Sequence, residues 1–285
     1  MVEDFARDDP EGFQNFIENV AIVGAGENIR KAIAEELLKT GKHTVTAITR
    51  NENTGSLLNG FKKASVSYED RKSVVAALKG QDFLIITLSL SAPPGTYTYL
   101  IQAATEAGVS YVMPNALVAG PATFGFDLKN CAITLYNDGE QAIKVSAWVQ
   151  CGRAVVFVLS HEILPENADD QLTTISQFHN KTVFASSFKI IQRNMLESVK
   201  RVTGTANSDW NIDHDTTKKR YSDGLEELKQ GKGDGIYKLM YAGVFQPTDD
   251  ADFASDNNLL GLPIEDMDEA TRTTISMYTE YPIDR

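Results

Sequence analysis

The chain contains few of the residues that build disulfide-rich or metal-binding proteins. Its 285 residues include only two cysteines, Cys131 and Cys151, which are too few for a disulfide scaffold and lack metal-ligand spacing. The four histidines are scattered, and His161-Glu162 is not followed by the second histidine of a zinc-binding helix. We therefore expect no metal site, and we expect the protein in the reducing cytoplasm.

Long apolar runs are also missing. No stretch approaches the ~20 apolar residues that cross a bilayer, and the longest candidate, residues 83–88, has the length of a strand. The N-terminus is acidic and polar, whereas a secretory signal begins with a basic region followed by an apolar run. We expect neither a membrane span nor a secretory signal.

Basic residues are scarce relative to acidic ones. The chain has 27 Lys and Arg against 39 Asp and Glu, a net charge of −12. Clustered cations are needed to contact nucleic-acid phosphates, so we expect no direct nucleic-acid binding. From Gln246 onward ten acidic residues face two arginines, so this tail supplies most of the charge. We interpret it as a solvated acidic surface, with a docking tail as the less favoured alternative.

The first half of the chain alternates between short apolar strands and helices. Apolar spacing and glycine stops predict helices at 27–40, 70–79 and 96–107, and strands at 20–23, 44–49, 63–68, 83–88 and 109–113. Near-continuous apolar strands indicate burial on both sides. We therefore predict an α/β fold with a Rossmann-like, doubly wound parallel sheet.

The second half predicts a smaller, mixed region. Asn137-Asp138-Gly139 is a hairpin signal between expected strands at 131–136 and 142–146. A helix is expected at 150–159 and a short strand at 182–185. A further helix, capped by Ser187 and stopped by Gly204, is expected at 188–202, and another at 218–229.

The first predicted strand runs into Gly24-Ala25-Gly26-Glu27-Asn28-Ile29-Arg30, which opens a helix. This strand–turn–helix context is typical of a dinucleotide-binding fingerprint. Glycine permits the tight turn, and free N–H groups at the helix start meet the pyrophosphate. Gly24, Gly26, Asn28 and Ile29 are therefore candidate cofactor-binding residues. The third glycine position holds Arg30, whose long side chain would crowd the helix–sheet crossing or extend to the phosphates.

Three further candidates follow the strands. Arg50 ends the second strand, 26 residues after Gly24, where an acidic residue would favour NAD and an arginine favours the 2′-phosphate of NADP. Ser89 and Asn115 follow the fourth and fifth strands, at the edge where open α/β sheets bind ligands. Each of these two is equally explained as an ordinary polar strand end.

Three segments of the first half resemble the NmrA-like and isoflavone reductase-like group of atypical short-chain dehydrogenase/reductase relatives, in particular its fungal members. They are VAIVGAGENIRKAIAEELLKTGKHTVTAITR, ALKGQDFLIITLS and YVMPN. Later segments of the chain are similar to the C-terminal half of the proteins in that group, namely FGFDLKN, YNDG, CGRAVVFVLS and NKTVFASSF. The resemblance implies an NADP-binding domain and, in reductase members, hydride transfer from NADPH to a small, often aromatic molecule. The group's glycine loop reads like GAGGNIG, so Glu27 and Arg30 replace two of its glycines.

The resemblance also exposes a gap after Asn115. Reductase members have there an active-site loop, a helix with the catalytic lysine and another parallel strand, whereas this chain has only residues 116–123 before Phe124. A parallel crossover takes about a dozen residues or more, so one βα unit is absent. We assign no catalytic residue and do not transfer the lysine to Lys129 or Lys144. The loss of the βα unit would expose apolar surface of the sheet to a protein partner or a second copy, unless another segment covers that surface.

Tyr68 and Lys72 match the Tyr-x-x-x-Lys pair of ordinary short-chain dehydrogenases, but they follow the third strand, on the adenine side. We interpret Tyr68 as a strand residue and Lys72 as a solvated charge.

The predicted organisation is an N-terminal extension at 1–19, an NAD(P)-binding domain at 20–123, and an interleaved substrate or interaction region at 124–285. Three hypotheses remain: an NADPH-dependent oxidoreductase, a non-catalytic NADP-sensing regulator, and a degenerate or mis-spliced family member.

Overall fold

The computed structural model describes residues 4–24, 27–50, 60–88, 92–114, 121–248 and 250–280. The chain divides into two compact units. The first comprises Met1–Val118, Trp148–Val183 and Asn258–Leu262, and the second comprises Ala119–Ala147, Phe184–Asn257 and Pro263–Arg285.

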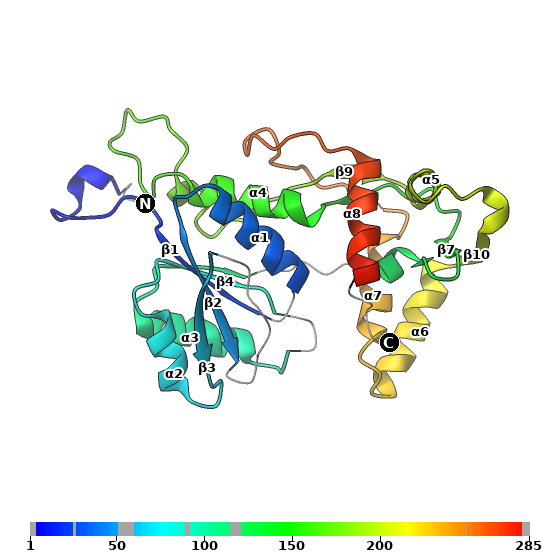
Figure 1. Cartoon of the computed structure of the whole chain (residues 1–285), viewed down its shortest axis with the longest axis horizontal. Coiled ribbons are helices and arrows are strands. Elements are labelled where there is room, and N and C mark those ends of the chain that lie inside the picture. The colour runs from blue at the N-terminus through cyan, green and yellow to red at the C-terminus, as the bar shows by residue number, and fades with distance from the viewer. Residues whose placement is uncertain are drawn as a thin grey trace. The chain divides into compact units, whose positions relative to one another are not determined.

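A five-stranded parallel sheet forms the centre of the first unit (Figure 1). Its order is β3-β2-β1-β4-β5, and its strands are β1 (Asn19–Val23), β2 (Thr44–Arg50), β3 (Lys62–Val66), β4 (Phe83–Ile86) and β5 (Tyr111–Pro114). All four residues of β4 are buried, as are four of the five in β1. This burial on both faces explains their continuous apolar sequences. The predicted α/β fold with a parallel sheet is confirmed.

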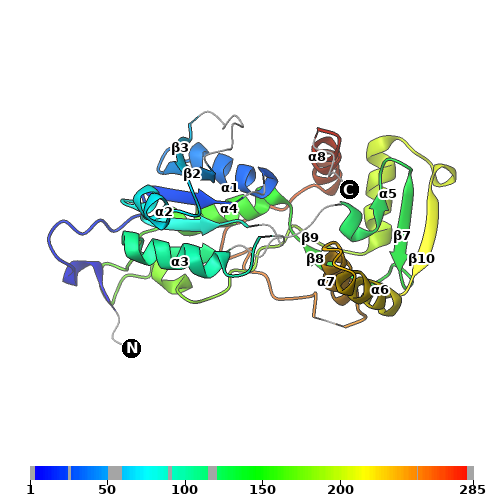
Figure 2. The same ribbon diagram turned by 90° about the horizontal axis from the view of Figure 1, so that it is seen from below.

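Two pairs of helices cover the faces of this sheet (Figure 2). α1 (Glu27–Lys39) and α4 (Trp148–Leu159) pack on one face, and α2 (Arg71–Leu78) and α3 (Thr96–Ala107) pack on the other. A Cβ on Gly152 of α4 would lie 2.7 Å from the carbonyl oxygen of Ala32, so glycine allows α1 and α4 to approach closely. A segment from beyond the gap thus completes the cover of the α1 face.

The sheet ends at β5. Only six residues separate Pro114 from the 3-10 helix η2 (Pro121–Phe124), too few for a helix and a strand. No described residue pairs with the outer edge of β5. The predicted absence of a βα unit after Asn115 is therefore confirmed, and it leaves Tyr111, Val112 and Met113 only partly buried in an edge strand.

The second unit is smaller and mixed, as predicted. β10 (Asn211–Asp215) pairs in parallel with β7 (Ala132–Tyr136), which pairs in antiparallel fashion with β6 (Phe126–Asp127). β8 (Ile143–Val145) pairs separately with β9 (Phe188–Ile190). The helices of this unit are α5 (Gln192–Thr203), α6 (Thr217–Lys229), α7 (Gly235–Val244) and α8 (Met267–Glu280).

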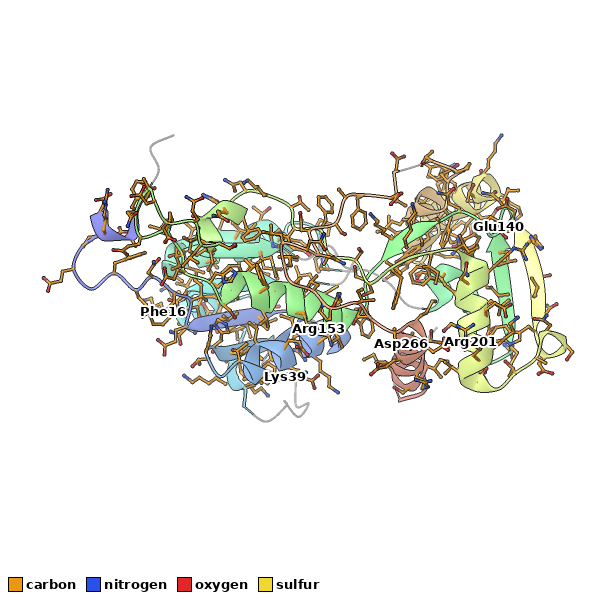
Figure 3. All side chains as sticks on the ribbon, turned by 90° about the horizontal axis from the view of Figure 1, so that it is seen from above. Phe16, Lys39, Glu140, Arg153, Arg201 and Asp266 are labelled. Carbon is orange, nitrogen blue, oxygen red and sulfur yellow. The ribbon has the colours of Figure 1, made fainter. Side chains whose placement is uncertain are left out.

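The last helix is attached to α5 by a charged contact (Figure 3, where Arg201 lies on α5 and Asp266 directly precedes α8). Arg201 donates two hydrogen bonds to the Asp268 carboxylate, of 2.9 and 2.7 Å, and the Ser198 hydroxyl donates a third of 2.6 Å. These bonds hold the pKa of Asp268 far below its usual range, and Arg201 contributes most. None of the α8 residues whose burial is described is buried.

Three local predictions in this unit are wrong. β7 and β8 form no hairpin, because β7 pairs with β10 and β6 while β8 pairs with β9. The Asn137 side chain instead accepts a hydrogen bond from the Thr217 N–H at the start of α6, 3.2 Å away. Residues 182–185 join no strand pairing among the described residues. The helix expected from 188 begins only at Gln192, because 188–190 form β9, although it ends before Gly204 as predicted.

No helix within the described ranges is long and apolar enough to cross a membrane.

Candidate functional site

Gly24 follows directly after β1 and occupies a position that only glycine tolerates. Its φ is +140°, and a Cβ there would lie 2.1 Å from the Thr87 carbonyl oxygen and 2.5 Å from the Thr87 Oγ1. Thr87 follows β4, and both its N–H and its buried hydroxyl donate to the carbonyl of Val23, at 2.6 and 3.0 Å. The bare Cα therefore lets the chain turn tightly at the carboxyl end of two adjacent strands.

The helix that follows this turn begins at Glu27, so its first N–H groups lie at the same edge of the sheet. Asn28 and Ile29 are in its first turn. The Ile29 side chain is buried in the core shared with α4, which leaves only its backbone for a ligand. The side chain of Asn28 lies outside the part of the chain that is described, as do Gly26, Ser89 and Asn115 altogether.

Arg30 lies at the turn. Its Nη1 donates to the carbonyl oxygen of Gly24 at 3.5 Å, and the side chain is only partly buried. The guanidinium therefore adds positive charge beside the glycine turn.

Arg50 is the last residue of β2 and is exposed. Because β2 neighbours β1 in the parallel sheet, Arg50 and Gly24 lie at the same edge. The Arg50 Cζ is 5.9 Å from the centre of the Tyr68 ring. Burial raises the pKa of Tyr68, and the positive charge of Arg50 only partly opposes this shift, so the phenol is neutral at physiological pH.

The contact between Arg50 and Tyr68 was not predicted from the sequence. Arg50 pairs in register with Val66 of β3, two residues before Tyr68, and only this register reveals the contact. Tyr68 lies in a turn, whereas Lys72 is on α2, which begins at Arg71. The two residues therefore do not share a helix, and this arrangement supports the non-catalytic interpretation of the pair.

The two lysines to which the family's catalytic lysine is not transferred lie outside the first unit. Lys144 belongs to the second unit, where its Nζ is 3.2 Å from the Asp252 carboxylate and also donates to the Phe253 carbonyl oxygen. Lys129 is exposed in a turn of the same unit. The described residues include no cluster of His, Cys, Asp and Glu that could hold a metal ion.

The strand-end turn, the helix start and the arginine lie at the carboxyl edge of the parallel sheet, the edge at which open α/β sheets bind ligands. Residues 24–145 match a family model described as NAD(P)H-binding. An oxidoreductase of Penicillium oxalicum, poxI, is 22% identical, over 84% of this chain and 88% of the relative.

Solved structures share the fold. An NADPH-dependent quinone oxidoreductase from Escherichia coli, in complex with NADPH, has a TM-score of 0.58 at 16% identity. Triphenylmethane reductase from Citrobacter sp., in complex with NADP(H), has a TM-score of 0.59 at 15% identity, and an isoflavone reductase has 0.57 at 14%. Each alignment covers 90% of this chain and 99% of the other.

The solved structures, at 14–16% identity, show that the fold is shared. The chain carries an NAD(P)H-binding domain and is a homologue of an oxidoreductase, with a nicotinamide dinucleotide as its cofactor.

Proposed function

We propose that this protein binds NADP(H) at the carboxyl edge of its five-stranded sheet. The observation that carries the proposal is the exposed Arg50 at the end of β2, where an acidic residue would bind the ribose hydroxyls of NAD. The Gly24 turn and the start of α1 would hold the pyrophosphate, together with Gly26 and the backbone of Asn28 and Ile29.

The net charge of −12 does not oppose this site. Electrostatic interactions between exposed charges are largely screened beyond about 8 Å at physiological salt, so the charges near the site decide the interaction. Arg50 and Arg30 place two cations at the edge that carries the glycine turn. A charge-assisted hydrogen bond contributes about 1.5–3 kcal/mol, which corresponds to roughly 10–100-fold in affinity.

Titration of the purified protein with NADPH and NADH, followed by nicotinamide fluorescence, tests this proposal. We expect Arg50→Gln to weaken NADPH binding roughly 10–100-fold and to leave NADH binding nearly unchanged. Lys62→Gln is the matched control, because it removes a charge from the exposed start of the neighbouring β3. Equal losses in the two variants, or no saturable NADPH binding by the wild type, would contradict the proposal.

For turnover, we propose NADPH-dependent reduction of a small, aromatic substrate. The cofactor would supply the hydride, and the chain would bind and orient it through the groups above. Ser89 and Asn115, which follow β4 and β5, are proposed to face the cofactor.

A second candidate is a non-catalytic NADP sensor. The missing βα unit favours it, because a positioned proton donor is typically worth ~10²–10⁴-fold in rate. Oxidation of NADPH in the presence of quinones, aromatic enones and aldehydes separates the two. Turnover supports the reductase, and tight binding with no turnover supports the sensor. A cooperative unfolding transition would dismiss the degenerate alternative.

The remaining partner proposals follow from the same gap. The partly buried outer strand β5 would pair with a protein partner or a second copy of the chain, which light scattering detects. We also propose a cytoplasmic location, because the chain has only two cysteines, too few for the disulfide scaffold of a secreted protein.

A further inference from the structure

Tyr68 is the aromatic residue next to the proposed 2′-phosphate site. It lies in the turn after β3 and packs against the apolar cluster beneath α2 and α3. The Cζ of Arg50 is 5.9 Å from its ring centre, within the range of a cation–π interaction. The ring therefore packs against the core and also contacts the guanidinium at the end of β2.

We propose that Tyr68 is a positioning residue that holds the Arg50 guanidinium where the 2′-phosphate of NADP binds, and thereby sets the preference for NADP over NAD. This inference rests on the proposed NADP binding. It also assigns a role to Tyr68, which matches a catalytic Tyr-x-x-x-Lys pair in sequence but does not share a helix with Lys72.

The physical argument begins with the freedom of the arginine. An exposed arginine has about 2 kcal/mol of side-chain entropy, part of which it loses whenever it fixes a ligand. A ring that already contacts the guanidinium removes some of that freedom before the ligand arrives, so less is lost on binding. Arginine stacks on aromatic faces through its flat surface, which leaves its N–H edge free for phosphate oxygens.

The surroundings of Arg50 support this role. Among the residues that the structure describes, no carboxylate forms an ion pair with Arg50. The nearby Asp70 carboxylate instead accepts the Lys72 N–H at 3.0 Å and caps α2. Tyr68 is also neutral, because burial raises its pKa, so it orients the guanidinium without neutralising it.

Two substitutions separate the aromatic face from the hydroxyl. Tyr68→Leu removes the face and keeps an apolar side chain, whereas Tyr68→Phe keeps the face. Tyr99→Leu is the matched control, because Tyr99 contacts another arginine, Arg71, at 5.8 Å in the same cluster. The probes are NADPH, NADH, and the fragment pair 2′,5′-ADP and 5′-ADP, which isolates the adenosine end.

We expect Tyr68→Leu to raise the Kd of NADPH and of 2′,5′-ADP about 3–10-fold, with little change for NADH and 5′-ADP. Tyr68→Phe and Tyr99→Leu should behave like the wild type. In an Arg50→Gln background, Tyr68→Leu should have no further effect, because a residue that acts through Arg50 has nothing left to position.

Other outcomes overturn the inference. Equal weakening of phosphorylated and unphosphorylated ligands by Tyr68→Leu would indicate a structural role alone. Unchanged affinity in Tyr68→Leu, with Arg50→Gln still discriminating, would refute the role of Tyr68 and leave the proposed NADP binding intact. If Tyr68→Leu fails to fold, equal discrimination by Tyr68→Phe and the wild type supports the proposal, and lost discrimination in Tyr68→Phe refutes it. Failure of the wild type to bind any of the four probes would refute both.

Discussion

Gly24→Ala should destabilise the first unit more than any other glycine-to-alanine change at a strand end. The added Cβ would lie 2.1 Å from the Thr87 carbonyl oxygen, and the φ of +140° lies in a region that is nearly exclusive to glycine. Thr87 cannot retreat easily, because its N–H donates to Val23 at 2.6 Å. Backbone strain costs about 1–3 kcal/mol and overpacking another 1–3 kcal/mol, so we expect a loss of roughly 2–6 kcal/mol.

Urea denaturation of the cofactor-free protein measures this loss, and two control variants divide it into its parts. Gly80→Ala has a positive φ of +73° but no atom within 4 Å of the new Cβ, so only backbone strain of about 1–2 kcal/mol applies. Gly152→Ala has no positive φ but approaches the Ala32 carbonyl to 2.7 Å, so only crowding applies. If Gly24→Ala loses no more stability than Gly80→Ala, the close approach to Thr87 is not as the structure has it, and the reasoning fails.

Three further predictions concern stability. Burial lowers the pKa of His43, whose Nδ1–H donates to a main-chain carbonyl at 2.9 Å. The unfolded chain therefore binds more protons, so stability should fall as pH drops below about 6.5, and urea midpoints of His43→Gln should depend less on pH. Gln192→Leu should cost roughly 2–5 kcal/mol by urea denaturation, because the buried amide makes three hydrogen bonds of 2.7–3.1 Å to main-chain groups. Asp268→Asn should weaken the contact between α8 and Arg201 and speed proteolysis near α8, whereas Glu269→Gln should not.

The first unit could be predicted from sequence because its signals are local. The helix expected at 96–107 has those bounds as α3, and Gly108, with φ +83°, ends it. Arg50 ends β2 as the pattern indicated, and the helix expected at 70–79 forms at 71–78 as α2, with Asp70 as its N-cap. Each of these features depends on residues within one turn or one strand, where apolar periodicity and glycine stops decide the conformation.

The second unit was harder because its pairings are distant. The turn signal at Asn137 predicted a hairpin, but β7 pairs with β10, which lies more than seventy residues further along the chain. Neither α7 nor α8 was expected. The contact between Arg50 and Tyr68 was missed for a related reason, since it depends on how β3 registers against β2.

The absence of the βα unit affects the segment expected to support turnover, but not the strands that carry the proposed cofactor site. β1 and β2, which carry the glycine turn and Arg50, are flanked by β3 and β4, so the gap beyond β5 removes none of their pairing partners. α4 returns from beyond the gap to cover the α1 face, which keeps the core closed. The resemblance implies that the catalytic lysine of reductase members would lie in the segment that is absent after Asn115. A protein built this way should retain NADPH binding even if it transfers no hydride, so binding alone would not show that it is an active reductase.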